Sequence, residues 1–157
     1  MSLRLALTLA AALGCGLVAG VFFGFSSFVM KALGRLPPPE GVSAMQSINI
    51  VVINPIFMGV FVGTAALCLA SGVLALGRWQ QPGAGLLLAG SLLYLAGTFG
   101  ATIAGNVPLN DALAALDPQS AEAARLWARY LVSWTAWNPV RTLAGLAAAA
   151  AFSLALR

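Results

Sequence analysis

Long uncharged apolar runs dominate the chain, and polar residues gather in short segments between them. The first run follows Arg4 and lasts until Lys31, and two more extend over about 54–77 and 84–106. A hydrocarbon core of about 30 Å needs roughly 20 helical residues. Each run therefore predicts a transmembrane helix, the first of them over about 5–33.

The last apolar run, Leu143–Leu156, is too short to cross a bilayer alone. A fourth span must therefore begin near Trp134 or Asn138, which gives a helix over about 136–156. This places Arg141 at the membrane boundary or inside it. An intramembrane charge is a candidate for a functional site, whereas a charge at a helix end snorkels to lipid headgroups. Position alone leaves both interpretations of Arg141 open.

Residues 118–134 have a different pattern, because charged side chains fall on one helical face and Trp127 and Trp134 on the other. This pattern is typical of an amphipathic helix that lies on the membrane surface or caps the bundle. The sequence thus predicts an all-α fold, an integral membrane four-helix bundle with an amphipathic interfacial helix between spans three and four. We expect a single transmembrane domain over 1–157, with both termini on one side of the membrane.

Asn-Pro and Asp-Pro pairs mark three predicted helix starts. Asn caps a helix N-terminus well and Pro suits the first helical position, so Asn54-Pro55 is expected to open the second span. The same argument places a start at Asp117-Pro118 and suggests that Asn138-Pro139 opens the fourth span. The triple proline at 37–39 ends the first helix, and a short interfacial helix is expected over about 44–53.

Glycines recur every fourth residue in the first span, at Gly16, Gly20 and Gly24, and the second span repeats the pattern with Gly59 and Gly63. Small residues at this spacing let helix backbones approach closely. The pattern predicts close packing inside the bundle along this face. Self-association of the chain into a homo-oligomer is the alternative.

The amino-terminal run also resembles the apolar part of a secretory signal peptide over Leu5–Leu13. Apolar character continues to Met30, however, which is too long for a signal peptide and favours a retained span. Basic residues on both sides leave the orientation open, with a lean towards termini inside. The expected location is the cell inner membrane, crossed several times.

Composition supports the membrane assignment, since 61% of residues are hydrophobic and only 8% are charged, against roughly 25% charged in soluble domains. The net charge of +4 comes without a basic run, so nucleic acid is not an expected partner. The chain contains no His, and Cys15 and Cys68 stand alone in apolar runs. We therefore expect no metal and no cofactor, and we interpret both cysteines as packing residues.

Polar and aromatic residues from four predicted elements meet at one membrane depth. They are Asn54, Asn106, Asn110, Asn138 and Arg141, with Phe22 and Phe25 from the end of the first span. Such a group suits a flat, largely apolar molecule with a developing negative charge. The alternative is that the Asn side chains only cap helices and join them.

Four segments carry a family resemblance: F-F-G-F-S-S-F-V-M-K-A-L (22–33), M-Q-S-I-N-I-V-V-I-N-P-I-F-M (45–58), N-V-P-L-N-D-A-L (106–113) and W-T-A-W-N-P-V-R-T (134–142). Together they resemble the anthrone-oxygenase-like family of small four-helix membrane proteins. The resemblance implies cofactor-independent oxidation of anthrones to anthraquinones. It also implies a shared site, which comprises Asn54, Asn106, Asn110, Trp137, Asn138 and Arg141.

In the family pattern a His commonly follows the Trp-Asn pair, and here Pro139 takes that place. His is a natural base for removing a carbon-bound proton, and without it Asp111 is the nearest candidate. Two interpretations follow. Either the chain is an oxygenase, in which Arg141 and the Asn amides stabilise an enolate and aromatic side chains such as Trp134 hold the rings, or it is a non-catalytic membrane protein that binds a lipid or quinone-like molecule or supports a partner complex. In both cases the expected partners are the lipid bilayer and a small apolar or aromatic molecule.

Overall fold

The structure is a computed structural model that describes residues 3–157, and every regular element within them is helical. The elements in chain order are α1 (Leu3–Gly24), the π-helical η1 (Phe25–Val29), α2 (Met30–Leu33), α3 (Pro38–Val51), α4 (Pro55–Gly77), α5 (Ala84–Leu92), the π-helical η2 (Leu93–Gly100) and η3 (Thr102–Asn106), α6 (Val107–Ala114) and α7 (Ala121–Leu154). The predicted all-α class is confirmed.

Three helices are long and apolar enough to cross a membrane: Leu3–Leu33, Pro55–Gly77 and Ala84–Ala114. They correspond to the first three predicted spans, and the third continues beyond its predicted end through α6. Their outer faces expose large apolar side chains such as Leu17 and Leu69, which are 60% and 59% exposed. Extensive exposed apolar surface marks a membrane-contacting face, so the chain is an integral membrane protein.

The predicted boundary between a surface helix over 118–134 and a separate fourth span is wrong, because α7 is one helix of 34 residues. Its N-cap is Ser120, whose Oγ accepts a hydrogen bond from Ala123 N at 3.0 Å. Asp117 closes only the preceding turn, where its Oδ1 accepts from Gln119 N at 3.0 Å. Pro139 lies inside α7 and does not open a helix.

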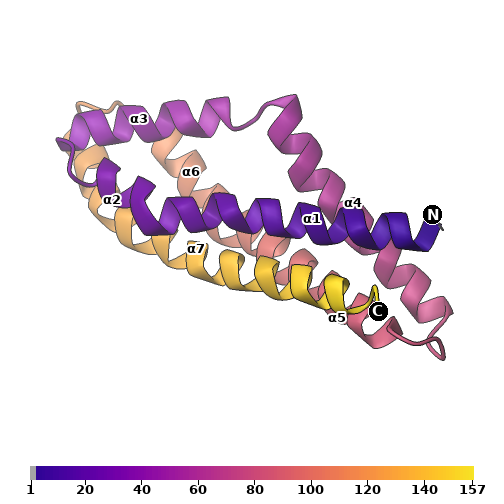
Figure 1. Cartoon of the computed structure of the whole chain (residues 1–157). Coiled ribbons are helices and arrows are strands. Elements are labelled where there is room, and N and C mark those ends of the chain that lie inside the picture. The colour runs from indigo at the N-terminus through magenta and orange to yellow at the C-terminus, as the bar shows by residue number, and fades with distance from the viewer. Residues whose placement is uncertain (1–2) are drawn as a thin grey trace.

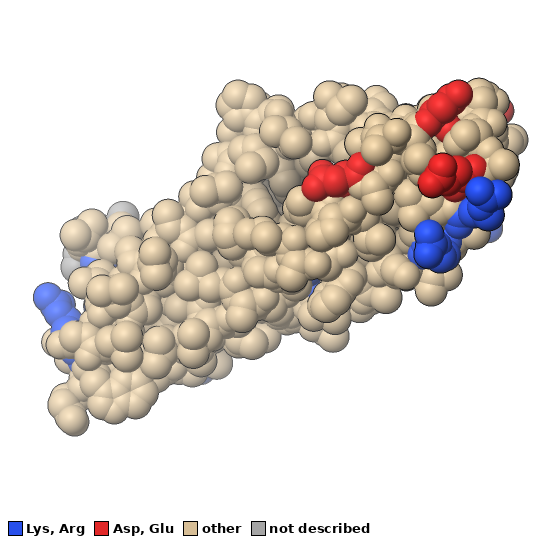
Figure 2. Space-filling view, turned by 180° about the vertical axis from the view of Figure 1, so that it is seen from behind, with Lys and Arg blue, Asp and Glu red and all other residues tan. Residues whose placement is uncertain are grey.

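Both termini and the α4–α5 turn lie at one end of the elongated molecule, as predicted, while α3, α6 and the start of α7 form the other end (Figure 1). The helices α1 and α7 run side by side along most of its length. Most charged side chains lie towards the two ends of the visible face, and one acidic side chain lies nearer its middle (Figure 2). The acidic side chains in this view all lie towards the end formed by α3, α6 and the start of α7.

The region that we call the stem is the core cluster at the end with the termini, built largely from small residues. Its buried members are Ala11, Ala12, Cys15, Val18, Phe22, Phe61, Ala65, Cys68, Ala75, Ala84, Leu87, Tyr94, Ala148 and Phe152. Glycines bring the backbones together here: a Cβ at Gly145 would lie 2.9 Å from Ala19 Cβ, and one at Gly97 would lie 2.5 Å from Ala144 Cβ. The helix α7 therefore packs against both α1 and η2 with almost no space for a side chain between the backbones.

The predicted glycine face does not make these contacts. A Cβ built on Gly16, Gly20, Gly59 or Gly63 would meet nothing within 4 Å, and one on Gly24 would meet only Phe28 of the same helix. The prediction of close packing along this face is therefore wrong. These glycines point away from the protein core, and the close contacts fall on other positions of the same helices, such as Gly14 against Thr64.

The two cysteines face each other across α1 and α4, with Cys15 Sγ 3.8 Å from Cys68 Sγ. Both are fully buried and both are free thiols. Both cysteines fill space in the stem, as predicted. The packing of α1 against α4 also brings their sulfur atoms together, and their separate positions in the sequence did not indicate this contact.

The region that we call the head is a second core cluster, at the end formed by α3, α6 and the start of α7. Its buried members are Met30, Leu33, Val42, Met45, Leu113, Ala123, Trp127, Tyr130 and Trp134. The helix α3 begins at Pro38, earlier than the short helix expected over 44–53. Gln46 Nε2 ties it to the end of α6 by donating to the carbonyl oxygens of Leu113 (2.8 Å) and Leu116 (3.0 Å).

Candidate functional site

Arg141 lies in the middle of α7 between the stem and the head, and only 1% of its surface is exposed. Its Nη1 donates to Thr102 Oγ1 at 3.3 Å, and its Nη2 donates to Asn138 Oδ1. Its Cζ lies over the Phe22 ring, 3.9 Å from the centroid, and 5.2 Å from that of Trp134. Arg141 is thus enclosed by protein, and the interpretation that it snorkels to headgroups is wrong.

The charge of this guanidinium has no acidic partner within residues 3–157. Its described hydrogen-bond acceptors are a hydroxyl and an amide oxygen, and its other close neighbours are aromatic rings. A buried charge is unfavourable unless an opposite charge or strong hydrogen bonds compensate it. Neutral acceptors and ring faces compensate it only in part, so the site favours a bound anion.

Two side chains of the third long helix bind the backbone of α7 on either side of this charge. Thr98 Oγ1 donates to Arg141 O at 3.2 Å, and Asn106 Nδ2 donates to Trp134 O at 3.2 Å. Thr98, Thr102 and Asn106 are spaced by four in the π-helical segments η2 and η3. A π-helical turn holds more residues than an α-helical turn, so residues four apart stay close to one line that faces α7.

Asn110 of α6 fixes the aromatic side of the site. Its Oδ1 accepts hydrogen bonds from Tyr130 Oη at 2.7 Å and from Trp134 Nε1 at 2.8 Å. The rings of Tyr130 and Trp134 stack with centroids 5.7 Å apart, and Trp127 continues the stack at 5.6 Å from Tyr130. One amide oxygen therefore orients two rings and presents the indole of Trp134 beside Arg141.

A cavity of about 90 Å³ lies against these residues where the stem meets the head. Its lining comes from all the long helices: Val21, Phe22, Phe25, Met45, Ile48, Asn49, Val52, Phe57, Phe61, Thr102, Asn106, Asn110, Trp134 and Arg141. Phenyl rings of the stem stack along one part of the wall, with Phe57 and Phe61 5.8 Å apart and inclined by 11°. The cavity is thus mostly apolar and aromatic, with polar groups at a few points.

Three buried polar atoms of this lining have no hydrogen-bond partner within residues 3–157: Asn49 Nδ2, Asn106 Oδ1 and Arg141 Nε. Leaving a buried polar group unsatisfied costs about 1–3 kcal/mol, and such groups are rare in folded proteins. The three atoms come from α3, η3 and α7. Their occurrence in one cavity lining therefore does not arise from a single local distortion of the backbone. Residues of the cavity lining therefore carry two N–H donors and one acceptor that no described protein group uses.

A family model described as anthrone oxygenase matches residues 57–151, which is more than half of the chain. The chain belongs to the anthrone oxygenase family. Searches of curated proteins and of solved structures find no match to it. The matched part of this anthrone-oxygenase-like membrane protein contains Asn106, Asn110 and Arg141, whereas Phe22, Phe25 and the whole of α3 precede it.

Most of the residues predicted from the sequence lie together in the anthrone-oxygenase-like chain. Those that line the cavity are Phe22, Phe25, Asn106, Asn110, Trp134 and Arg141. Asn138 stands behind the wall, fully buried, and its Oδ1 accepts from Arg141. It positions the guanidinium and does not line the cavity.

Three predicted site residues lie elsewhere. Asn54 is the N-cap of α4, and its side chain is used locally: Oδ1 accepts from the backbone N–H groups of Ile56 and Phe57, and Nδ2 donates to Val51 O. Trp137 is 39% exposed and covers Gly105 of the third long helix. Asp111 is exposed on α6 and does not reach the cavity, so the structure gives no support to it as a base.

Other contributors were missed by the sequence analysis. They are Met45, Asn49, Phe57, Phe61, Thr102 and Tyr130. Asn49 belongs to a segment expected to lie at the interface, and only the folding of α3 over the bundle brings it to the cavity. Thr102 had a usable signal, because its spacing of four from Thr98 and Asn106 places all three on one line.

Proposed function

We propose that this membrane protein binds a flat phenolic or polycyclic aromatic substrate in the cavity beside Arg141 and oxidises it with O₂ without a cofactor. The observation that carries the proposal is a buried guanidinium with no carboxylate partner, flanked by aromatic rings and facing a cavity with unused donors. Preorganised donors aimed at developing negative charge are a main source of catalysis in such sites. Aromatic walls add affinity for a flat ring system.

The proposed chemistry begins with an anthrone, whose ring carbon opposite the ketone carries two hydrogens. Loss of one as a proton leaves an anion delocalised onto the ketone oxygen. The electron-rich carbon then combines with O₂, and protonation gives a hydroperoxide on that carbon. Elimination of water forms the second ketone. One oxygen atom of O₂ stays in the quinone, and the other leaves as water, so the two hydrogens lost from carbon balance the two hydrogens of the water formed.

The role assigned to Arg141 is to stabilise the enolate oxygen, with its free Nε as one donor and Asn49 Nδ2 as a second. No His exists in the chain, and the residues that line the cavity include no carboxylate. We therefore assign the first proton transfer to water, with the guanidinium lowering the pKa of the bound substrate. A cation beside an acidic group favours its ionised form.

Access for a tricyclic substrate requires the wall to move, because about 90 Å³ is below the roughly 300–1,000 Å³ of usual ligand pockets. We assign this movement to α3, which supplies Met45 and Asn49 to the wall and is joined to its neighbours by short connections. Met45 is flexible and adapts its shape more readily than a branched side chain. The substrate would then reach the cavity sideways from the bilayer.

The second candidate is a non-catalytic protein that binds a quinone-like or phenolic molecule, or supports a partner complex. The observation in its favour is the lack of a carboxylate or imidazole in the cavity lining. Binding of an anion requires only Arg141 and the amides, whereas turnover also requires proton transfer and access of O₂. The two candidates share one ligand class and differ in whether product appears.

For topology, we propose one transmembrane domain over 1–157 with four crossings of the cell inner membrane. The fourth crossing is the C-terminal part of α7, about 136–156, which packs along α1. The N-terminal part of α7 would lie with the head outside the hydrocarbon core. This arrangement puts both termini on one side.

The function is tested with purified protein in detergent, a hydroxylated anthrone as the substrate, and simultaneous readings of quinone absorbance and O₂ consumption. We expect turnover above the protein-free rate only when O₂ is present. Arg141→Lys keeps the charge but loses the planar fork, and we expect its rate to fall by about 10²–10³-fold, as for removal of one oxyanion donor. Arg125→Lys is the matched control, because Arg125 is exposed on the same helix.

Substrate binding is followed in the same samples by quenching of tryptophan fluorescence, since Trp134 lines the cavity. Binding that depends on Arg141, without turnover above the protein-free rate, would select the non-catalytic candidate. Equal rates and equal binding in wild type and Arg141→Lys would contradict both.

A further inference from the structure

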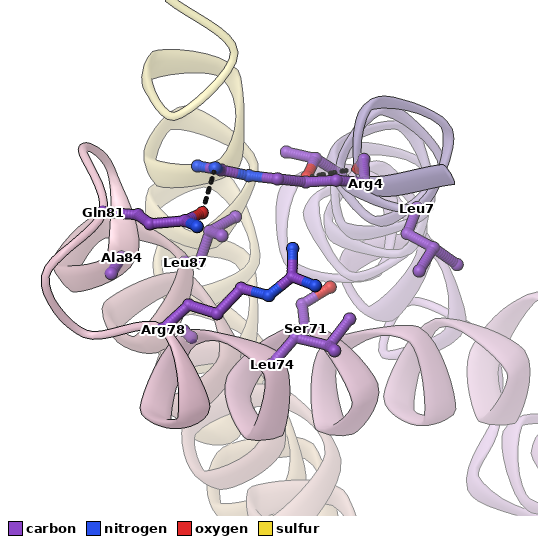
Figure 3. A pocket seen from close by; sticks show the side chains of 10 residues that line it. Arg4, Leu7, Ser71, Leu74, Arg78, Gln81, Ala84 and Leu87 are labelled. Carbon is purple, nitrogen blue, oxygen red and sulfur yellow. Dashed lines mark hydrogen bonds between the residues drawn. The ribbon is translucent and has the colours of Figure 1, made fainter. Parts of the chain in front are cut away.

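A second cavity, far from the Arg141 site, lies at the end of the molecule that holds the termini. It has a volume of about 40 Å³ and is bounded by the start of α1, the end of α4 and the turn to α5 (Figure 3). Its walls are mostly apolar, with Leu7, Leu74 and Leu87 among them, and two arginines, Arg4 and Arg78, belong to the same lining. Such a space accommodates a few water molecules or one small polar group.

Arg4 is held firmly in place at this cavity. Its Nη1 donates to Gln81 Oε1 at 3.1 Å, and its Nη2 donates to Pro82 O at 2.8 Å. Thr8 Oγ1 donates back to Arg4 O at 2.9 Å. The guanidinium therefore bridges α1 and the α4–α5 turn in one fixed geometry, and its acceptors are both neutral.

Arg78 approaches the same space from the end of α4, and its guanidinium points towards Ser71 and Arg4 (Figure 3). The Arg78 guanidinium makes no hydrogen bond to a protein group within residues 3–157, although the backbone N–H of Arg78 donates to Ala75 O. The four Asp and Glu residues of the chain lie on α3, α6 and the segment that opens α7, at the opposite end. Two cations thus face one cavity without an acidic side chain nearby.

Ser71 provides an independent indication of a ligand. Its side chain is 3% exposed and lines the cavity, yet its Oγ has no hydrogen-bond partner. Ser91, which is also buried in a helix, satisfies its hydroxyl by donating to the carbonyl four residues earlier, Leu87 O, at 2.8 Å. The hydroxyl of Ser71 makes no such bond within residues 3–157, and it lies beside the guanidinium of Arg78 (Figure 3).

We propose that this cavity binds one phosphate group, held by Arg4 and Arg78 with Ser71 Oγ as a third donor, and that the phosphate belongs to the headgroup of an acidic phospholipid. Arginine pairs with phosphate through charge-assisted hydrogen bonds of fixed geometry. The cavity is too small for an acyl chain, so the chains of the lipid stay in the bilayer. The leucine-lined walls fit the boundary between headgroups and hydrocarbon, where this end of the bundle lies.

The test uses the full chain in nanodiscs of phosphatidylcholine that contain a minor fraction of phosphatidylglycerol, followed by native mass spectrometry of retained lipid. We expect one phosphatidylglycerol to be retained by the wild type. Arg78→Gln and Ser71→Ala should each weaken retention by roughly tenfold, the effect of losing one hydrogen bond to a charged group. The matched controls are Arg125→Gln, a loss of charge at the opposite end, and Ser91→Ala, the loss of a serine whose hydroxyl is already satisfied.

A second arm distinguishes the source of the phosphate. Inorganic phosphate is titrated against protein in neutral detergent, with thermal unfolding and ³¹P NMR as readouts. Stabilisation by inorganic phosphate that depends on Arg78 and Ser71, without selective retention of phosphatidylglycerol, would show that the site takes soluble phosphate and would overturn the lipid assignment. Equal loss of lipid in Arg78→Gln and Arg125→Gln, or unchanged retention in Ser71→Ala, would overturn the site itself.

Discussion

The stem and the head share α7 but are held together by different forces. In the stem, backbones meet at Gly145 and Gly97, and the filling residues are mainly alanine, cysteine and phenyl rings. In the head, two methionines and a stack of three aromatic rings form the core, and the amide oxygen of Asn110 holds two of the rings. The stem is thus fixed mainly by shape, with a buried hydrogen bond from Tyr94 Oη to Phe61 O at 2.9 Å between two of its helices. The head depends on polar bonds that have to be satisfied together.

The cavity lies where these two kinds of packing meet, and this position explains its composition. Where backbones meet at Gly145 and Gly97 there is no room for a ligand, and a fully paired polar network has no donors left to bind one. At the junction, rings of the stem such as Phe22 and Phe61 stand opposite amides whose partners are incomplete. The comparison teaches that the cavity beside Arg141 lies where shape-based packing ends and polar pairing begins.

The largest loss of stability in the head is expected on removal of the Asn110 side chain. Asn110→Ala leaves the Tyr130 hydroxyl and the Trp134 indole N–H buried without an acceptor, at about 1–3 kcal/mol for each donor. We expect thermal unfolding in detergent at a lower temperature, together with loss of the ligand site. Asn110→Asp keeps an acceptor oxygen at the same place and should recover much of the stability.

A double variant of Asn110 and Tyr130 tests this prediction more sharply. Tyr130→Phe removes one of the two donors, so the double variant Asn110→Ala/Tyr130→Phe should be less unstable than the sum of the single variants. Strict additivity would mean that the hydrogen bond from Tyr130 to Asn110 contributes nothing.

An added side chain at Gly145 should break the stem. Gly145→Leu places atoms against Ala19 Cβ and Cys15 O, and overpacking of this kind costs about 1–3 kcal/mol. The matched control is Gly20→Leu, where a Cβ meets nothing within 4 Å. Thermal unfolding in detergent should separate the two variants clearly, and equal stability would contradict the assignment of α1–α7 contact to Gly145.

The smallest expected effect belongs to Asp111→Asn. The sequence analysis placed Asp111 as a base, but its side chain is exposed outside the cavity. We expect stability within about 0.5 kcal/mol of wild type, as for ordinary surface substitutions, and unchanged turnover of the anthrone. A large loss of turnover with intact stability would restore Asp111 as a base and would move the proposed proton transfer from water to this carboxylate.

The same Asn-Pro signal succeeded once and failed once, and the reason is physical. Asn54-Pro55 opens α4 because the preceding residues are not helical and Asn54 Oδ1 is free to cap two backbone N–H groups. At Asn138-Pro139 the preceding segment is already an amphipathic helix, and Asn138 Oδ1 is occupied by Arg141. An Asn-Pro pair therefore starts a helix only under two conditions. The residues before it must not already be helical, and the Asn side chain must be free to accept hydrogen bonds from backbone N–H groups.

The convergence of Asn106, Asn110 and Arg141 could be predicted, because spacing of four along a helix and the end of an apolar run fix their faces and depth. The sequence could not predict which glycines contact a neighbouring helix, because the direction in which a helix face points depends on partners that are distant in sequence. The same limit hid Asn49: its place at the cavity depends on how α3 folds back over the bundle. Likewise, the pairing of Cys15 with Cys68 depends on the relative register of α1 and α4.

The length of α7 has a consequence for how a ligand would leave. A helix of 34 residues extends for about 50 Å at 1.5 Å per residue, well beyond a hydrocarbon core of about 30 Å. On the proposed topology, Arg141 lies about 20 Å along α7 from its end at Leu154, which is deep in the hydrocarbon layer and nearer the head. A phenol reaches that depth from the lipid only in its neutral form. Once ionised beside the guanidinium, it is trapped, because an anion has no route back through hydrocarbon. Release of the bound phenolate then requires that it takes up a proton or that it is converted to a neutral quinone. The neutral product can return to the membrane through the hydrocarbon layer, which the bound anion cannot cross.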